Sequence, residues 1–126
     1  MIVHTLAVGP LETNCYIVAC AETRACVVID PGGDADEIWN CIQKHRLTVH
    51  SILLTHAHFD HMAAVAALAQ ATHAPLAIHP DDEPLLKLGG GGLMWGFAIP
   101  PAPPPDVHLA EGQIIETGAL RLHVLH

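Results

Sequence analysis

The sequence predicts an α/β protein built on a mixed β-sheet with helices on one face. From residue 25 to residue 79 the pattern alternates strand, helix, strand, helix, strand, which is typical of parallel strand pairings. Hydrophobic residues make up 51% of the 126 residues and charged residues only 14%, which excludes bulk disorder and indicates a large interior. A chain of this length is sufficient for one modest domain.

The first part of the chain predicts three strands in an antiparallel meander. Apolar and other residues alternate loosely from Ile2 to Val8, and Asn14 to Cys20 is rich in β-branched and aromatic residues. Ala25 to Ile29 is apolar enough to be buried on both faces. Gly9-Pro10 and the polar turn 21–24 separate the three strands.

The next part predicts two helices around a short buried strand. The turn Asp30-Pro31-Gly32-Gly33 ends the third strand, and Asp34 can cap the helix that follows. That helix is expected from Ala35 to His45, because its apolar residues recur at core-facing spacing. Ser51 to Thr55 is the buried strand, and Met62 to Ala71 is an Ala-rich second helix.

The middle of the chain predicts one further strand and helix, followed by a long loop. Leu76 to His79 is the strand, and a short helix begins at Pro80 and continues to about Leu88. Gly89 to Pro105 combines a glycine run, an aromatic segment and five prolines. Because structureless loops of this length are uncommon inside a domain, it is either a functional flap or a flexible insertion.

The last 20 residues predict short strands. Val107 to Leu109, Gln113 to Glu116 and Ala119 to Leu125 are separated by the turns 111–112 and 117–118, which we expect to join them as hairpins.

The composition restricts the possible partners and location. A net charge of −8 argues against nucleic acid or an anionic membrane surface as the main partner. No apolar run approaches the ~20 residues that a bilayer requires, and no basic segment followed by an apolar core marks a leader, so we expect a cytoplasmic protein. The four cysteines form no C-x-x-C pair, and we expect reduced, buried thiols rather than a disulfide or a thiolate metal site.

The strongest functional signal is the segment Thr55-His56-Ala57-His58-Phe59-Asp60-His61, between a buried strand and a helix. Imidazole and carboxylate groups are ligands of zinc, iron and manganese. His56 and His58 can face one ion, and Asp60 and His61 can reach a second ion beside it. Each residue alone has an ordinary explanation, such as a helix cap for Asp60. All four together at this spacing favour a two-metal hydrolase centre, in which two ions share a bridging water.

The number of ligands in this segment is too small for two complete sites. A catalytic zinc usually keeps three protein ligands and a water, so four side chains do not satisfy two ions. Four other histidines are available in principle, but none lies in a comparable motif: His79, His108, His123 and His126.

Several motifs together resemble the metallo-β-lactamase-fold hydrolases, in particular the glyoxalase II-like (hydroxyacylglutathione hydrolase-like) branch. They are Thr55 to His61, Val28 to Gly33, Asn14 to Val18, Glu111-Gly112 and Leu122 to His126, in the order that the family has them. The resemblance implies a four-layer αββα sandwich of two similar halves, of which residues 1–126 would be the N-terminal part, a single incomplete domain.

The resemblance also implies roles for individual residues. His56 and His58 would bind the first metal, and Asp60 and His61 the second. Asp60 would in addition act in catalysis by holding and orienting the attacking hydroxide. Asp30 would stand just behind the ligands, although an ordinary turn aspartate before a proline explains it equally well.

The C-terminal end of the sequence departs from the family pattern. Family members continue into a Thr-Pro-Gly-His segment, a bridging aspartate and a further histidine, which complete the metal sites. Their absence here leads us to expect a truncated chain with weak or no activity. A missing second half would also leave a sheet face uncovered, and such an apolar patch favours self-association.

The function that the resemblance implies is hydrolysis of a small thioester such as acylglutathione by attack of metal-bound hydroxide. The expected cofactor is Zn²⁺, two ions in the complete site, with iron or manganese as alternatives. Two other functions remain open: a persulfide dioxygenase with a single iron, and a metal-binding remnant without activity.

Overall fold

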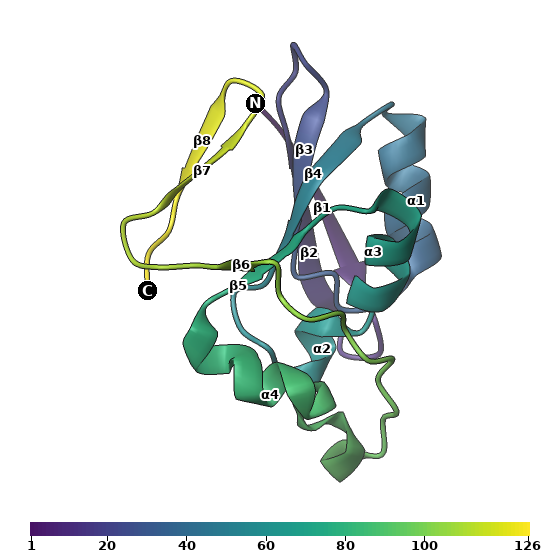
Figure 1. Ribbon diagram of the computed structural model, residues 1–126. Coiled ribbons are helices and arrows are strands. Elements are labelled where there is room, and N and C mark those ends of the chain that lie inside the picture. Colours follow the sequence, from purple (N-terminus) through teal and green to yellow (C-terminus); the bar gives the residue numbers. More distant parts are fainter.

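The computed structural model describes all 126 residues and contains a six-stranded sheet with helices on one face and a separate hairpin on the other (Figure 1). The fold class predicted from the sequence, a mixed sheet with helices on one face, is confirmed. The strands of the large sheet lie side by side in chain order: β1 (Ile2–Val8), β2 (Thr13–Ala19), β3 (Ala25–Ile29), β4 (Thr48–Leu53), β5 (Leu76–Ile78) and β6 (Val107–His108).

The sheet changes from antiparallel to parallel pairing at β3. The pairs β1–β2 and β2–β3 are antiparallel, which confirms the predicted meander. The three pairs from β3 to β6 are parallel, which requires the chain to cross over between strands. The carboxyl ends of β3, β4, β5 and β6 therefore meet at one edge of the sheet.

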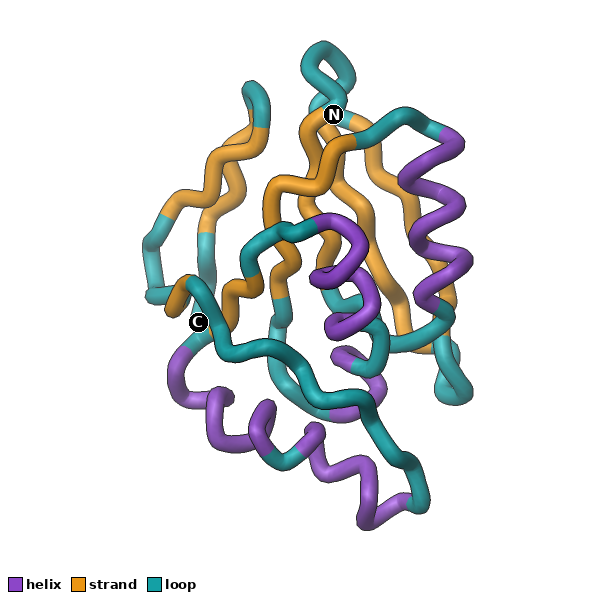
Figure 2. Tube along the Cα trace, turned by 45° about the vertical axis from the view of Figure 1, so that its right-hand side comes forward, coloured by secondary structure: helices purple, strands orange, loops and turns teal.

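The helices α1 (Ala35–Lys44) and α3 (Val65–Thr72) cover one face of the sheet, as two views of the molecule show (Figures 1 and 2). The main hydrophobic core of 20 buried residues lies between them and the strands. Ile38 and Ile42 of α1 pack there with Ile17 and Ile52 of the sheet, all at most 1% exposed. Each such side chain contributes about 1.5–3 kcal/mol when it is fully buried.

The opposite face of the sheet packs against the hairpin formed by β7 (Ile114–Thr117) and β8 (Leu120–His123). A small cluster of Val27, Leu53, Ala77 and Leu109 lies on this face, and Leu122 from the hairpin is among the side chains packed against it. None of the helices combines the length and the apolar character that a membrane crossing requires.

Two local expectations about the helices were wrong. Asp34 precedes α1, but its side chain makes no capping hydrogen bond; its Oδ2 instead accepts one from the backbone N–H of Gly9, at 2.9 Å. The helix expected over 62–71 is α3, but it begins only at Val65, and a separate short helix, α2 (Phe59–Met62), precedes it. The interruption occurs at Ala64, whose N–H donates to the carbonyl of Pro31, outside the helix.

Three further elements differ from the expectation. The strand expected from Ser51 to Thr55 is β4, which begins at Thr48 and ends at Leu53. The segment 89–105 is not wholly irregular, because the 3₁₀ turns of η2 (Gly89–Trp95) follow the short helices η1 (Pro80–Asp82) and α4 (Glu83–Lys87). β6 does not form a hairpin with β7; it pairs in parallel with β5, and only β7 and β8 form one.

Candidate metal centre

The segment 55–61, called the histidine loop below, leaves β4 at the edge where the carboxyl ends of the parallel strands meet. Asp30 follows β3, Thr55 follows β4 by two residues, and His79 follows β5. Ligand sites of open α/β sheets occur at such an edge, outside the carboxyl ends of the strands. The parallel pairing of β3, β4 and β5 thus brings residues far apart in sequence to one place.

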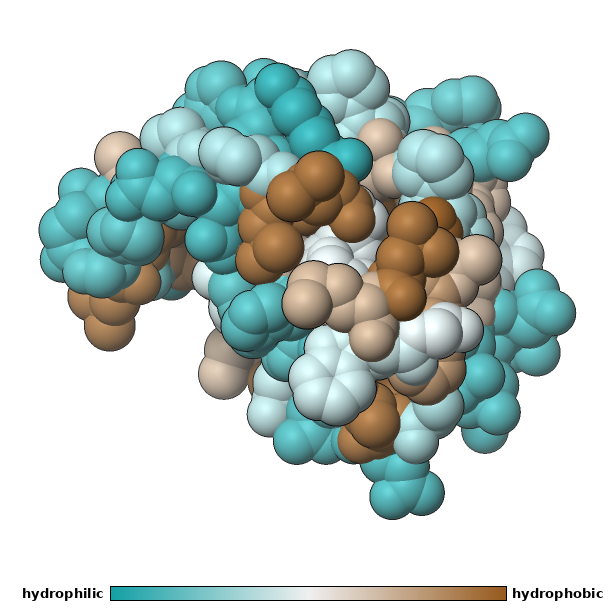
Figure 3. Space-filling model, turned by 90° about the horizontal axis from the view of Figure 1, so that it is seen from below, coloured by the Kyte–Doolittle hydropathy of each residue, from teal (hydrophilic) through white to brown (hydrophobic).

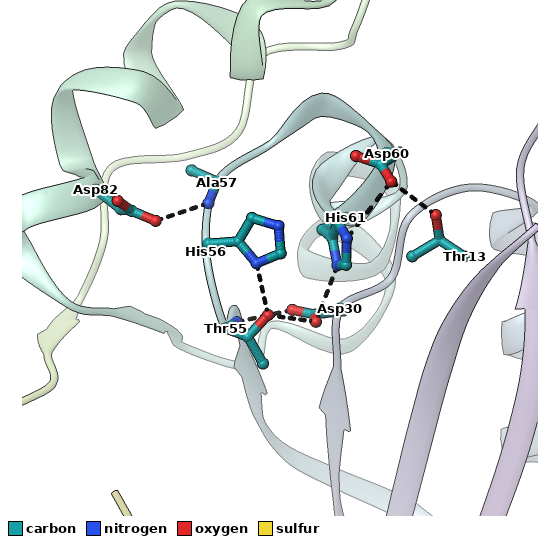
Figure 4. A network of polar contacts seen from close by, with 8 residues as sticks. All are labelled: Thr13, Asp30, Thr55, His56, Ala57, Asp60, His61 and Asp82. Carbon is teal, nitrogen blue, oxygen red and sulfur yellow. Dashed lines mark hydrogen bonds and ion pairs between the residues drawn. The ribbon is translucent and has the colours of Figure 1, made fainter. Parts of the chain in front are cut away.

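His56 and His61 lie against each other in the histidine loop (Figure 4). Their ring centroids are 4.0 Å apart, and the potential ligand atoms of His56, His61 and Asp30 all lie within 4.8 Å of one another. Imidazole nitrogens and a carboxylate oxygen at this spacing are a donor set that suits zinc, iron or manganese. The residues present therefore fit a transition-metal ion.

Asp30 is the polar residue that ties this cluster together. It is 4% exposed, and its two carboxylate oxygens accept hydrogen bonds from the N–H and the Oγ1 of Thr55, at 2.8 and 2.6 Å. The Nδ1 of His61 lies 3.0 Å from Asp30 Oδ2. A carboxylate there accepts the proton of Nδ1, so that Nε2 of His61 remains free to bind a metal.

Asp60 is held from two sides. Its Oδ2 accepts a hydrogen bond from Thr13 Oγ1 at 2.9 Å and lies 3.4 Å from Nε2 of His61 (Figure 4). Its backbone lies directly against the glycine turn, because a Cβ added to Gly32 would be 1.8 Å from the carbonyl oxygen of Asp60. Only glycine allows this approach, and the turn after β3 thereby fixes the position of Asp60.

His58 is the most exposed of the four predicted ligands. It directly precedes α2, and its ring meets that of His56 edge-on, with centroids 4.8 Å apart. Burial, followed by the neighbouring His61 and His58, lowers the pKa of His56. The neutral imidazole that binds a metal is therefore the favoured form of His56 at neutral pH.

The structure adds residues that the sequence did not single out. Thr13 has no local signal, because its contact to Asp60 spans 47 positions. Asp82 accepts a hydrogen bond from the N–H of Ala57 at 3.0 Å and so fixes the middle of the histidine loop. At the same sheet edge, His79 and His126, two of the histidines that the sequence left available, stack with ring centroids 3.5 Å apart, and Asp81 lies beside both.

An open groove of about 540 Å³ lies beside the histidine loop, within the range of small-molecule sites. His58 and Asp60 contribute polar atoms to its wall, and its apolar lining includes Leu11, Phe59, Leu85, Met94, Trp95 and Phe97. Figure 3, seen from below, shows apolar side chains gathered on this underside of the molecule among polar ones. The groove can therefore receive an apolar group next to the predicted ligands.

The family profile described as "Metallo-beta-lactamase superfamily" matches residues 8–126. The Bacillus subtilis protein named "Probable metallo-hydrolase YqgX" is 36% identical over 110 residues, covering 85% of this chain and 50% of that protein. A hydroxyacylglutathione hydrolase of Albidiferax ferrireducens is 40% identical over 93 residues, covering 71% of this chain and 36% of that enzyme.

Two solved structures are similar over most of this chain. The crystal structure of the BLEG-1 B3 metallo-beta-lactamase has a TM-score of 0.89 and 32% identity, covering 99% of this chain and 61% of the other. The crystal structure of TTHA1623 in a di-iron-bound form has a TM-score of 0.80 and 41% identity, covering 88% of this chain and 56% of the other. The chain thus spans about half the length of the curated relatives that it matches.

Proposed function

The chain belongs to the metallo-beta-lactamase superfamily, and on that premise we propose that its histidine loop is part of a hydrolase centre for small thioesters such as acylglutathione. The observation that carries the proposal is the grouping of His56, His61 and Asp30 within 4.8 Å, with Asp60 beside His61. Buried strands deliver these side chains to a sheet edge that lies beside a groove, which is the arrangement that a catalytic metal requires.

We propose a centre of two zinc ions, with iron as the main alternative. His56 and His58 would hold the first ion, and Asp60 and His61 the second. When bound, the ions would supply Lewis acidity at the carbonyl oxygen of the substrate and lower the pKa of a water molecule beside it. The di-iron form of TTHA1623, 41% identical to this chain, supports iron as a candidate.

The side chains around the ligands have positioning roles in this proposal. Asp30 holds the His61 ring through Nδ1, and Thr55 holds Asp30. Thr13 donates to Oδ2 of Asp60, which leaves Oδ1 available to the second ion and to the attacking water beside it. The apolar side of the groove would receive the acyl part of the substrate, away from the polar histidine loop.

Thioesters are the proposed substrates because a hydroxyacylglutathione hydrolase is among the relatives. The similarity to a B3 metallo-beta-lactamase favours a β-lactam as the second candidate substrate. The two are separated by measuring turnover of a glutathione thioester and of a cephalosporin side by side on zinc-loaded and iron-loaded protein. Oxygen consumption with glutathione persulfide tests the dioxygenase alternative in the same samples.

The test uses the 126-residue chain, its metal content and a matched variant. We expect bound metal, slow thioester turnover and no β-lactam turnover. Turnover should be slow because four side chains are fewer than two catalytic ions usually require. His56→Asn should abolish turnover and metal binding at the histidine loop, whereas His50→Asn, an exposed histidine of β4, should preserve both. Thioester turnover that is indifferent to His56→Asn would refute the assignment of the site.

A further inference from the structure

A second group of potential metal ligands lies at the β1 edge of the sheet, three strands away from β4. It consists of His4 on β1, Cys41 on α1 and His45, which caps the end of that helix. None of the three belongs to the histidine loop, and none has a role in the proposed hydrolase chemistry.

The fold places these side chains together by two simple means. Cys41 and His45 are four residues apart and therefore lie on the same side of α1, one turn from each other. His4 alternates inward on β1, where the helix covers the strand. The His4 and His45 rings stack with centroids 4.1 Å apart, at an interplanar angle of 24°.

The ligand atoms of the three residues all lie within 4.8 Å of one another, and each residue is half-buried. Bonds of about 2.0–2.3 Å place the ligand atoms of a tetrahedral zinc roughly 3.3–3.8 Å apart. The three atoms therefore need to close by roughly 1 Å, which side-chain rotation can provide. Two imidazoles and a thiolate are a donor set for zinc and other borderline or soft transition metals.

We propose that His4, Cys41 and His45 form a second, independent site for a divalent transition metal such as Zn²⁺. Three protein ligands leave one position for water or another small ligand. Binding converts the thiol of Cys41 to a thiolate–metal bond and releases one proton to solvent. The ion would link β1, an edge strand without a partner on its outer side, to α1.

Burial favours the neutral imidazole of His4 but also the protonated thiol of Cys41, so a metal ion must displace the Cys41 proton. Burial, followed by His45 and Lys44, lowers the pKa of His4, which favours the neutral ring that a metal requires. Burial raises the pKa of Cys41, while the nearby ammonium group of Lys44 opposes that rise. The other explanation of the cluster is ordinary packing, in which a pair of stacked rings covers a thiol.

Cobalt distinguishes this site from the histidine loop, because a thiolate bound to Co²⁺ gives an intense charge-transfer absorption band and the histidine loop contains no cysteine. Metal-free protein is titrated with Co²⁺ and followed by absorbance. We expect the band to appear and saturate in the wild type, where the histidine loop also takes up Co²⁺, and to be absent in Cys41→Ser. Cys20→Ser is the matched control and should retain the band, because Cys20 lies outside the cluster.

Two more variants separate metal binding at this cluster from misfolding and from binding at the histidine loop. His45→Gln should weaken the apparent Co²⁺ affinity of the band more than tenfold, and it replaces Cys41→Ser as the test if circular dichroism shows that the serine variant does not fold. His56→Asn should leave the band unchanged, so failure of the hydrolase centre would not affect the result. A wild type without the band, or a band that persists in Cys41→Ser, would show that the cluster is packing only.

Discussion

At the scale of single residues, Asp30 is the side chain on which the polar contacts of the candidate centre converge. It adopts a left-handed backbone conformation, with φ of 53°, and it is almost fully buried. Three donors surround its two oxygens, two from Thr55 and one from His61. A buried carboxylate with these partners orients the ligands without having to bind the metal itself.

We expect Asp30→Asn to weaken zinc binding by about 10–100-fold, because an amide cannot accept all three hydrogen bonds. The same change should lower the free energy of unfolding by about 1–3 kcal/mol, the usual effect of an unsatisfied buried polar group. Competition titration with a zinc chelator and urea unfolding measure the two effects. Asp36→Asn, in the exposed first turn of α1, is the control: it should leave zinc binding unchanged and lower the free energy of unfolding by no more than about 0.3–1 kcal/mol, the helix-dipole contribution.

Cys20 gives the stability of the protein a dependence on pH. A hydrogen bond from the Thr23 side chain, followed by backbone N–H groups, lowers its pKa from 9.0 to about 7. The folded state therefore favours the thiolate, and this contribution to stability is full above pH 9 and is lost as the pH falls through 7.

The free energy of unfolding should consequently rise between pH 7 and pH 9 in the wild type, and less steeply in Cys20→Ser. Urea unfolding at several pH values, under reducing conditions, measures the two slopes. Equal slopes would show that Cys20 does not titrate in this range.

At the scale of elements, η2 packs directly against the histidine loop. A Cβ added to Gly90 would lie 2.3 Å from the N of Phe59 and 2.5 Å from the carbonyl oxygen of Ala57. Phe97, just after η2, stacks on Phe59 with ring centroids 5.2 Å apart. The glycine run therefore brings the backbone of η2 against that of the histidine loop. This contact favours a functional segment over a flexible insertion with no role.

We expect Gly90→Ala to reduce metal affinity and hydrolase activity at least tenfold, because the methyl group must push the histidine loop away from η2. Gly91→Ala is the matched control: Gly91 has a similar positive φ, but a Cβ there meets nothing within 4 Å. Both variants carry the backbone strain, so the difference between them isolates the contact. Isothermal titration with zinc measures the affinity of each variant. Equal losses of affinity in the two variants would show that the contact between η2 and the histidine loop does not support the site.

Helices and strands were predictable from the sequence where a local residue pattern determines them. They were not predictable where a contact to a residue far away in the chain determines the structure. The three N-terminal strands and α1 carry clear periodicity and lie close to their expected positions. Asp34 failed as a cap because the N–H of Gly9 reaches its carboxylate from 25 positions away. The histidine motif predicted the candidate site from local spacing, whereas Thr13 and Asp82 join it only through the fold.

At the scale of the whole molecule, the two faces of the large sheet are covered unequally. Two helices and the main core protect one face, whereas the other has only the β7–β8 hairpin. Between hairpin and sheet lies an open hollow of about 320 Å³, whose apolar lining includes Ile29, Leu53, Leu109, Ile115 and Leu122. Apolar surface of this kind favours contact with another apolar surface.

We expect the 126-residue chain to self-associate through this face as its concentration rises. Sedimentation velocity over a concentration series measures the effect. Leu122→Lys should shift the equilibrium toward the monomer, because it places a charge in the hollow. Leu93→Lys, at a residue that is 78% exposed on η2, is the control and should not. A chain that stays monomeric throughout would contradict the prediction.

The strand order of the large sheet affects the order in which the chain can fold during synthesis. Every strand from β2 to β6 pairs with the strand that precedes it in the chain, so each finds its partner already present during synthesis. The two antiparallel pairs join neighbouring segments and can form early, whereas the parallel pairs from β3 to β6 must first close a crossover and form more slowly. The meander and α1 can assemble first, and the histidine loop then emerges onto a sheet edge that already carries Asp30 and the glycine turn.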